Sequence, residues 1–176
     1  RFRHELARVA VELAMLPLRG KALHARVLAA LSTGAAGAAG LARLVHHAHH
    51  AGDAEAVLRL TPRAACEAAS RGALREAAAH CRTALCYGDA LDDRGRAELL
   101  DDYASYSFEV NDLGAAIPAR EAAIELFARV GDVRRQCAAL AAHAMPLVRA
   151  LRNADAEAAS RRALGLAKTL GPGPEL

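Results

Sequence analysis

Four histidines crowd into the five-residue stretch from His46 to His50, and imidazole nitrogens are common ligands of transition metals. On a helix, residues four apart lie on neighbouring turns, so His46 and His50 could hold one zinc or nickel ion. The stretch contains no Asp, Glu or Cys, and the nearest acids, Asp53 and Glu55, follow an expected turn. We therefore favour packing or polar-face roles and predict no metal site. A metal-binding protein that uses this cluster is the less favoured alternative.

Two pairs of neighbouring acids could indicate general acid–base or metal chemistry. Asp92 and Asp93 stand at the expected start of a helix, where a carboxylate caps free backbone N–H groups. Asp101 and Asp102 lie further along the same helix, on a face that we expect to be solvated. No Ser/His/Asp or Cys/His arrangement has local support. The sequence thus predicts that this chain is not an enzyme.

Cysteine usage and charge limit the cellular setting and the partners. The four cysteines, at positions 66, 81, 86 and 137, form no CxxC pair, and we expect them to be reduced in a cytoplasmic protein. The net charge of +3 is spread over mixed signs without a basic block, which gives no argument for DNA binding by this segment. No stretch of ~18 apolar residues occurs, so we expect no membrane span.

Composition favours helices throughout. Ala is abundant, and Leu, Arg and Glu supply most of the rest, whereas aromatic residues make up 3% and Trp is absent. Gly, Asp and Asn punctuate the chain into helical segments joined by short loops, which makes consecutive helices antiparallel neighbours. An interruption is expected at Pro62 and a kink at Pro146. The segments expected are Arg3–Leu16, Arg19–Leu31, Leu41–Ala51, Ala54–Ser70, Ala73–Cys86, Asp93–Val110, Leu113–Val130, Val133–Arg152 and Ala154–Leu170, with a linker at Ser32–Gly40.

A repeat of 39–40 residues organises the second half of the chain. Alternate helices carry two alanines seven residues apart, which places both on one helix face and lets a partner helix approach closely. A turn signal precedes each of these helices, and the helix before it places a small residue at one equivalent position. The paired alanines are Ala77 and Ala84, Ala116 and Ala123, and Ala156 and Ala163; the turn signals are Arg71-Gly72, Asn111-Asp112 and Arg152-Asn153; the small residues are Ala65, Ala104 and Ala144. We predict an all-α fold of antiparallel helix pairs, stacked as a TPR-like superhelical array.

The pattern resembles tetratricopeptide repeats with a longer period, similar to the superhelical repeats of MalT-like transcription activators. Phe2–Leu31 looks like the stretch that follows the ATPase module of large LuxR-type regulators. Leu41–Leu58 and Gly72–Leu85 look like the start of their helical-repeat region, and the final GPGPEL looks like an inter-repeat loop. The resemblance implies three parts: residues 1–31 at the end of a winged-helix module, a linker at 32–40, and repeats at 41–176.

The resemblance implies a sensor or scaffold segment of an ATP-dependent transcription regulator. ATP or ADP would bind a STAND-type ATPase module, and DNA a helix-turn-helix domain, both outside this chain, which lacks a GxxxxGK[ST] loop. His4 resembles a nucleotide-sensing histidine of the family. Because the chain starts at Arg1 without Met, we expect it to be part of a longer protein. The alternative function is a self-association module that makes the parent a homo-oligomer.

In the resembled superhelices, the first helix of each pair lines the concave side, where a protein partner or a small-molecule inducer would dock. Phe108 is the expected anchor there, because an aromatic ring supplies buried area while flanking charges orient the partner. The alternative, given equal weight, is that Phe108 packs against the next helix. The tetratricopeptide register assigns Arg59, Cys66, Glu98, Asp101, Ser105, Phe108, Glu109, Met145 and Arg149 to this face.

Overall fold

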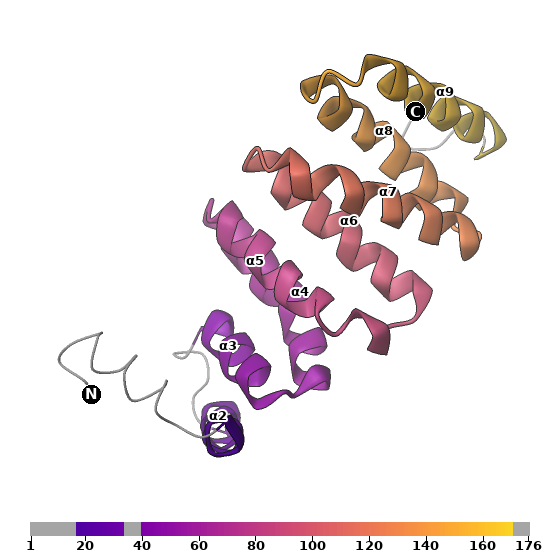
Figure 1. Ribbon diagram of the computed structural model, residues 1–176. Coiled ribbons are helices and arrows are strands. Elements are labelled where there is room, and N and C mark those ends of the chain that lie inside the picture. Colours follow the sequence, from indigo (N-terminus) through magenta and orange to yellow (C-terminus); the bar gives the residue numbers. More distant parts are fainter. Residues whose placement is uncertain (1–16, 34–39, 171–176) are drawn as a thin grey trace. The chain divides into compact units, whose positions relative to one another are not determined.

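The computed structural model describes residues 17–33 and 40–170, and these residues form helices joined by short connections (Figure 1). No strand occurs among them, so the predicted all-α fold is confirmed. The expected helix Arg3–Leu16, His4 and the final GPGPEL lie outside the described residues, as does most of the expected linker. The helices are α2 (Pro17–Thr33), α3 (Leu41–Ala51), α4 (Ala54–Ser70), α5 (Leu74–Leu85), α6 (Asp93–Glu109), α7 (Leu113–Arg129), α8 (Val133–Arg149) and α9 (Asn153–Leu170), with a 3-10 turn, η2, at Gly88–Ala90.

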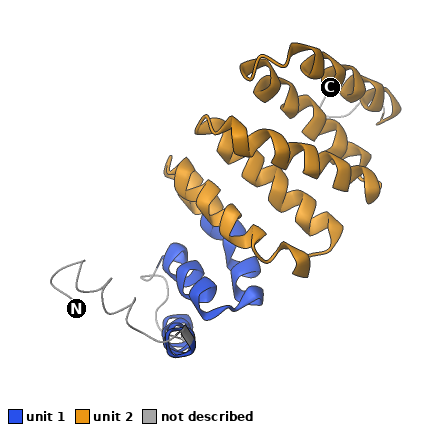
Figure 2. Cartoon of the chain, in the orientation of Figure 1, with its two compact units in different colours: residues 1–64 blue, residues 65–176 orange. Residues whose placement is uncertain are grey.

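The chain divides into two compact units, Arg1–Ala64 (unit 1) and Ala65–Leu176 (unit 2; Figure 2), so that α4 begins in the first and ends in the second. In unit 1, α2 packs against α3. Helix α3 is amphipathic and buries Leu44, Val45 and Ala48, spaced so that they share one face. Helix α2 contributes Leu28 as its buried side chain. Unit 1 therefore joins α2 to α3 through a small apolar contact.

Unit 2 stacks α5 to α9, and each helix packs against the next along the chain. Its core surrounds Phe127, Leu140 and Leu147, each of which stabilises the fold by about 1.5–3 kcal/mol through burial. The paired alanines of the sequence repeat are all buried at the helix contacts, which is where the repeat requires close approach. These are Ala77, Ala84, Ala116, Ala123, Ala156 and Ala163.

The turns repeat with the helices. Among the described residues, five helices are followed by a residue with positive φ, whose backbone satisfies the free carbonyls of the last helical turn. After α7, for example, the Gly131 amide donates to the Ala128 carbonyl at 3.1 Å and the Asp132 amide to the Phe127 carbonyl at 2.9 Å. The Asp132 carboxylate then accepts from the Arg135 amide and starts α8. The five residues are Gly52, Gly72, Asn111, Gly131 and Leu151.

The end of α8 differs from its prediction. The helix ends at Arg149 rather than Arg152, because Leu151 adopts the left-handed conformation, with φ 60°, that follows α3, α4, α6 and α7 at Gly or Asn. The Leu151 amide donates to the Val148 carbonyl and the Arg152 amide to the Leu147 carbonyl. A leucine therefore stands where the turn favours glycine.

Prolines do not divide the helices. The interruption expected at Pro62 is wrong, because α4 continues from Ala54 to Ser70 through this residue. Proline removes one helical hydrogen bond, but its neighbours Thr61 and Ala64 are buried, and packing offsets the lost bond. Pro146 lies in the last turn of α8, so only a few helical hydrogen bonds are formed by residues after it.

Candidate functional site

The α6 residues that were predicted to line the docking face share one stripe of that helix. Two of them, Glu98 and Phe108, contact side chains of α8. The guanidinium of Arg149 lies over the Phe108 ring, 4.7 Å from its centroid. Glu98 pairs with Arg135 at 3.3 Å, near the other end of the two helices. Side chains of α6 and α8 therefore meet near both ends of the two helices, and Phe108 and Arg149 lie together.

A buried arginine anchors the middle of this stripe. Arg120 of α7 is 5% exposed and forms an ion pair with Asp101, while its second terminal nitrogen donates to the Ser105 hydroxyl at 2.8 Å. Asp101 was expected on a solvated face; its side chain is 32% exposed, and its carboxylate neutralises a guanidinium that the packing of α7 keeps from water. Asp101 and Ser105 thus join α6 to α7, so their polar groups are already engaged. The sequence around Arg120 carries no local signal for its burial, so Arg120 was not among the predicted residues.

Acidic groups and thiols lie beside the stripe. The pKa of Asp102 is raised because the packed helices displace part of its water shell and because Asp101 and Glu98 repel its charge. Burial, reinforced by Asp102, raises the pKa of Cys81 to about 12, so this thiol is not a nucleophile at neutral pH. All four cysteines are free thiols, and Cys66 is exposed.

Helix α8 turns an apolar stripe to solvent. Met145 is 57% exposed and Val148 is 44% exposed, and Ala138, Ala141 and Ala142 continue the stripe toward the start of the helix. Such a row of exposed apolar side chains on a folded helix is typical of a binding surface. Glu109 is exposed at the end of α6, whereas Arg59 is exposed in unit 1. We define the α6–α8 face as Glu98, Asp101, Asp102, Ser105, Phe108, Glu109, Met145, Val148 and Arg149.

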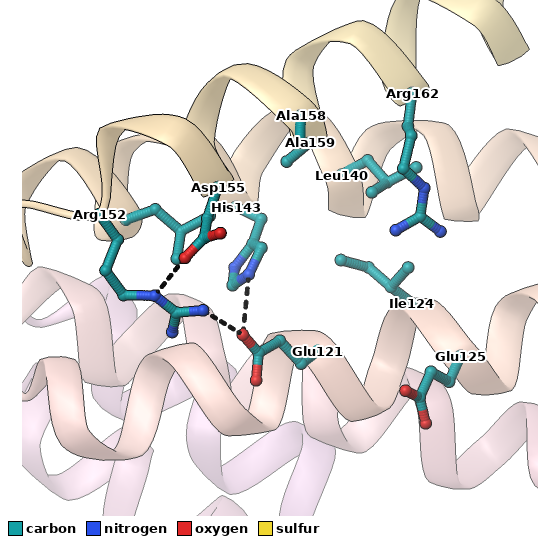
Figure 3. Close-up of a pocket in the computed structure, with 11 residues that line it drawn as sticks. Glu121, Ile124, Glu125, Leu140, His143, Arg152, Asp155, Ala158, Ala159 and Arg162 are labelled. Carbon is teal, nitrogen blue, oxygen red and sulfur yellow. Dashed lines mark hydrogen bonds and ion pairs between the residues drawn. The ribbon is translucent and has the colours of Figure 1, made fainter.

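A pocket of about 300 Å³ lies between α7, α8 and α9, away from the predicted residues (Figure 3). Leu140, Ile124 and Leu147 supply its apolar lining. Arg152 bridges two carboxylates at one end, since its Nε donates to Asp155 at 2.7 Å and a terminal nitrogen lies 3.4 Å from Glu121. Glu125 and Arg162 lie at the other end in Figure 3.

His143 is the buried polar group of this pocket. Its Nε2 lies 3.6 Å from the Glu121 carboxylate, and its Nδ1 is buried without a hydrogen-bond partner. Burial lowers the pKa of His143 below its ordinary 6.5; Glu121 opposes this shift, and Arg120 and Arg152 reinforce it. A neutral imidazole beside a carboxylate could accept a proton, but the residues that line the pocket include no Ser, Thr, Cys, Lys or Tyr to act as a nucleophile.

A second pocket, of about 500 Å³, lies between α5 and α6 at the corresponding place of the preceding repeat. Tyr103 stands there 40 residues before His143, and Arg82 stands 39 residues before Glu121. The repeat therefore creates the same hollow twice but lines it with different charges. The spacing of 39–40 residues is therefore the sequence signal from which His143 and Glu121 could have been predicted to line a pocket.

One group among the described residues could hold a metal ion. His24 of α2 lies beside His46 and His47 of α3, and one ligand atom from each lies within 4.8 Å of the others. His24 gives no signal in the histidine run, because it lies in a different helix. The remaining described helices carry no comparable group.

Comparison with protein-family models, with curated proteins and with solved structures gives no match to this chain. No described helix is both long and apolar enough to cross a membrane.

Proposed function

We propose that this chain is a non-catalytic binding module that docks a protein partner on the α6–α8 face. The observation that carries the proposal is the exposed apolar stripe of α8 beside the Phe108–Arg149 contact. Aromatic and arginine side chains dominate the binding energy of many interfaces. The Phe108 ring and the aliphatic part of the Arg149 side chain would lose their contact with water on docking.

The chemistry of the face favours a partner segment that is both apolar and basic. Met145 and Val148 offer apolar area, Glu109 presents a solvent-exposed carboxylate at the edge of the stripe, and Asp102 adds a partly desolvated one. The carboxylate of Asp101 is paired with Arg120, so it joins α6 to α7 rather than contacting the partner. An amphipathic helix with a few basic residues would satisfy both parts of this surface.

The parent that we propose is a LuxR-type ATP-dependent transcription regulator, in which this chain is the sensor or scaffold segment. The support is the resemblance of Leu41–Leu58 and Gly72–Leu85 to that family's helical repeats. ATP or ADP and DNA would then bind other domains of the parent. A small-molecule inducer is the alternative occupant of the face.

Self-association is a second candidate, favoured by the exposed apolar side chains themselves. Met145 on α8 and Leu164 on α9, which is 61% exposed, could each bury area against a second copy. Light scattering of the purified chain separates the two functions, because a monomer at tens of micromolar would contradict self-association through these residues.

Gene replacement in the source organism tests the regulator and the face together. Met145→Glu places a charge in the stripe, and Leu164→Glu is its matched control, because both residues are similarly exposed but only the first lies on the face. We expect Met145→Glu to reproduce the transcript changes of a strain that lacks the gene, at unchanged protein abundance, while Leu164→Glu matches wild type.

Two results would contradict the proposal in different ways. If loss of the gene changes no transcripts, the parent is not a transcription regulator. If loss of the gene changes transcripts but Met145→Glu behaves as wild type, the regulator stands and the α6–α8 face is not its docking surface.

A further inference from the structure

Four imidazole rings meet where α2 packs on α3 in unit 1. The Nδ1 atoms of His24 and His47 lie 2.9 Å apart. The ring centroid of His24 lies 5.7 Å from that of His46, 5.1 Å from that of His47 and 4.9 Å from that of His50. Within α3 the ring centroid of His46 already lies 5.2 Å from that of His47 and 4.4 Å from that of His50, and His24 adds a ring from α2 to this cluster.

The two helices bring these rings together as a consequence of their packing. Burial of Leu44, Val45 and Ala48 fixes how α3 faces its neighbours and leaves His46 exposed and His47 half-buried. His24 precedes Leu28, the buried residue of α2, by one helical turn, so both side chains project from the same side of that helix. The cluster is thus positioned by apolar contacts on both helices, and the contact between the His24 and His47 Nδ1 atoms joins the two helices across it.

We propose that His24, His46 and His47 form a binding site for a divalent transition-metal ion, and that zinc is the principal ion bound there. Their ligand atoms already lie within 4.8 Å of one another. A tetrahedral zinc ion with bonds of about 2.0–2.1 Å needs ligand nitrogens about 3.3 Å apart, a separation that small side-chain rotations reach from here. The fourth ligand would be water or His50, whose ring centroid lies 4.9 Å from that of His24 and 4.4 Å from that of His46.

The donor set selects the class of ion. Imidazole nitrogens bind zinc, copper, nickel and cobalt, whereas calcium and magnesium require oxygen ligands. The group contains three nitrogens and no carboxylate or thiolate. Calcium and magnesium are therefore expected not to bind here.

Metal binding would fasten α2 to α3. Among the described side chains of α2, Leu28 is buried and Leu18 is 83% exposed, so a bound ion would add stability to the packing of this helix on α3. A ligand that binds only the folded arrangement shifts the equilibrium toward it. The bound ion would thus act as a cross-link between the two helices and would protect the backbone amides of α2 from hydrogen exchange.

The test uses the whole chain without an affinity tag, freed of metal by a chelator. Titration calorimetry with zinc chloride is expected to give one ion per chain, and cobalt chloride is expected to give the visible absorption of a tetrahedral site. Because no sulfur takes part, the thiolate charge-transfer band in the near ultraviolet should be absent. That last readout distinguishes this site from zinc bound to the exposed thiols of Cys66 and Cys86.

Two single variants decide whether the site is built by α2 and α3 together. His24→Gln should weaken zinc binding by more than about tenfold, since it removes a direct ligand and even outer partners of metal sites account for 10–100-fold. His49→Gln is the matched control, because His49 belongs to the same run but is not one of the three ligands. It should keep the wild-type affinity.

Equal zinc affinity in wild type and His24→Gln would overturn the proposal, because it would show that the histidine run of α3 alone binds the ion. Absence of binding to wild type at one equivalent would overturn it as well. A zinc-dependent gain of hydrogen-exchange protection in α2 of the wild-type chain supports it without any variant. A binding defect in His24→Gln whose dichroism spectrum matches wild type supports the proposal as well.

Discussion

The guanidinium of Arg149 covers the ring of Phe108 at 4.7 Å from its centroid, which joins the last turn of α8 to the last turn of α6. Phe108 remains partly exposed beneath this contact, whereas Phe127 is fully buried in the core of unit 2. The two rings thus have different roles in the same helical stack.

Replacing these rings should separate surface from core. Phe127→Ala is expected to destabilise the fold by about 3–5 kcal/mol because it opens a cavity. Phe108→Ala should cost about 1 kcal/mol, of which the arginine contact accounts for about 0.5–1 kcal/mol. Urea denaturation measures both. Equal losses for the two variants would mean that Phe108 is a core residue, the alternative that the sequence left open.

The buried ion pair should respond unequally to the loss of each partner. Asp101→Ala leaves the Arg120 guanidinium buried without its counter-charge and is expected to destabilise the chain by about 2–3 kcal/mol. Arg120→Met fills a similar volume and leaves Asp101 able to reach water, so it should cost about 1 kcal/mol or less. Chemical denaturation of both variants checks this order. The reverse order would show that solvent reaches Arg120.

Enlarging a repeat alanine should overpack the helix contacts. Ala116 of α7 is fully buried, and Ala116→Leu is expected to destabilise by about 1–3 kcal/mol. Ala128 lies on the exposed side of the same helix, and Ala128→Leu should change stability by less than about 0.5 kcal/mol. Thermal unfolding compares the two. Equal midpoints would contradict the register of the repeat.

The strained turn after α8 can be relieved. Leu151 has φ 60° and is 86% exposed, so Leu151→Gly loses little packing and removes a backbone conformation that costs about 1–2 kcal/mol outside glycine. Glycine also increases the entropy of the unfolded chain, which lowers stability. After this cost is subtracted, we expect Leu151→Gly to increase the free energy of unfolding by roughly 0.5–1 kcal/mol. Leu164→Gly, within α9, should instead destabilise by about 1 kcal/mol. Calorimetric midpoints that fall for both variants would rule out strain at Leu151.

Acidification should destabilise the fold partly through His143. Because burial lowers its folded pKa below the ordinary 6.5, the unfolded chain binds the proton more readily. The contribution of His143 is therefore complete above pH 6.5 and is lost as the pH falls below it. We expect His143→Gln to lose less stability than wild type between pH 7.5 and about 5.5, as measured by denaturant midpoints. Parallel losses would show that protonation of His143 is not coupled to folding.

Local pattern determined the helices and most turns. The alanine spacing and the Gly-Asp and Asn-Asp signals act within one or two helical turns, so the sequence alone placed Ala77, Ala116 and Asn111 where the structure has them. Leu151 escaped this reasoning because its left-handed conformation is imposed by the packing of α8 and α9, against the preference of leucine itself.

Only tertiary packing decided which polar groups meet. Arg120 reads as a surface residue in its own helix, and it is buried because α6 covers it and supplies Asp101. His24 lies in a different helix from the histidine run, and no periodicity within either helix reveals that their rings come together. Such pairs depend on the rotation and approach of whole helices. These are set by the sum of many apolar contacts rather than by the residues that finally face each other.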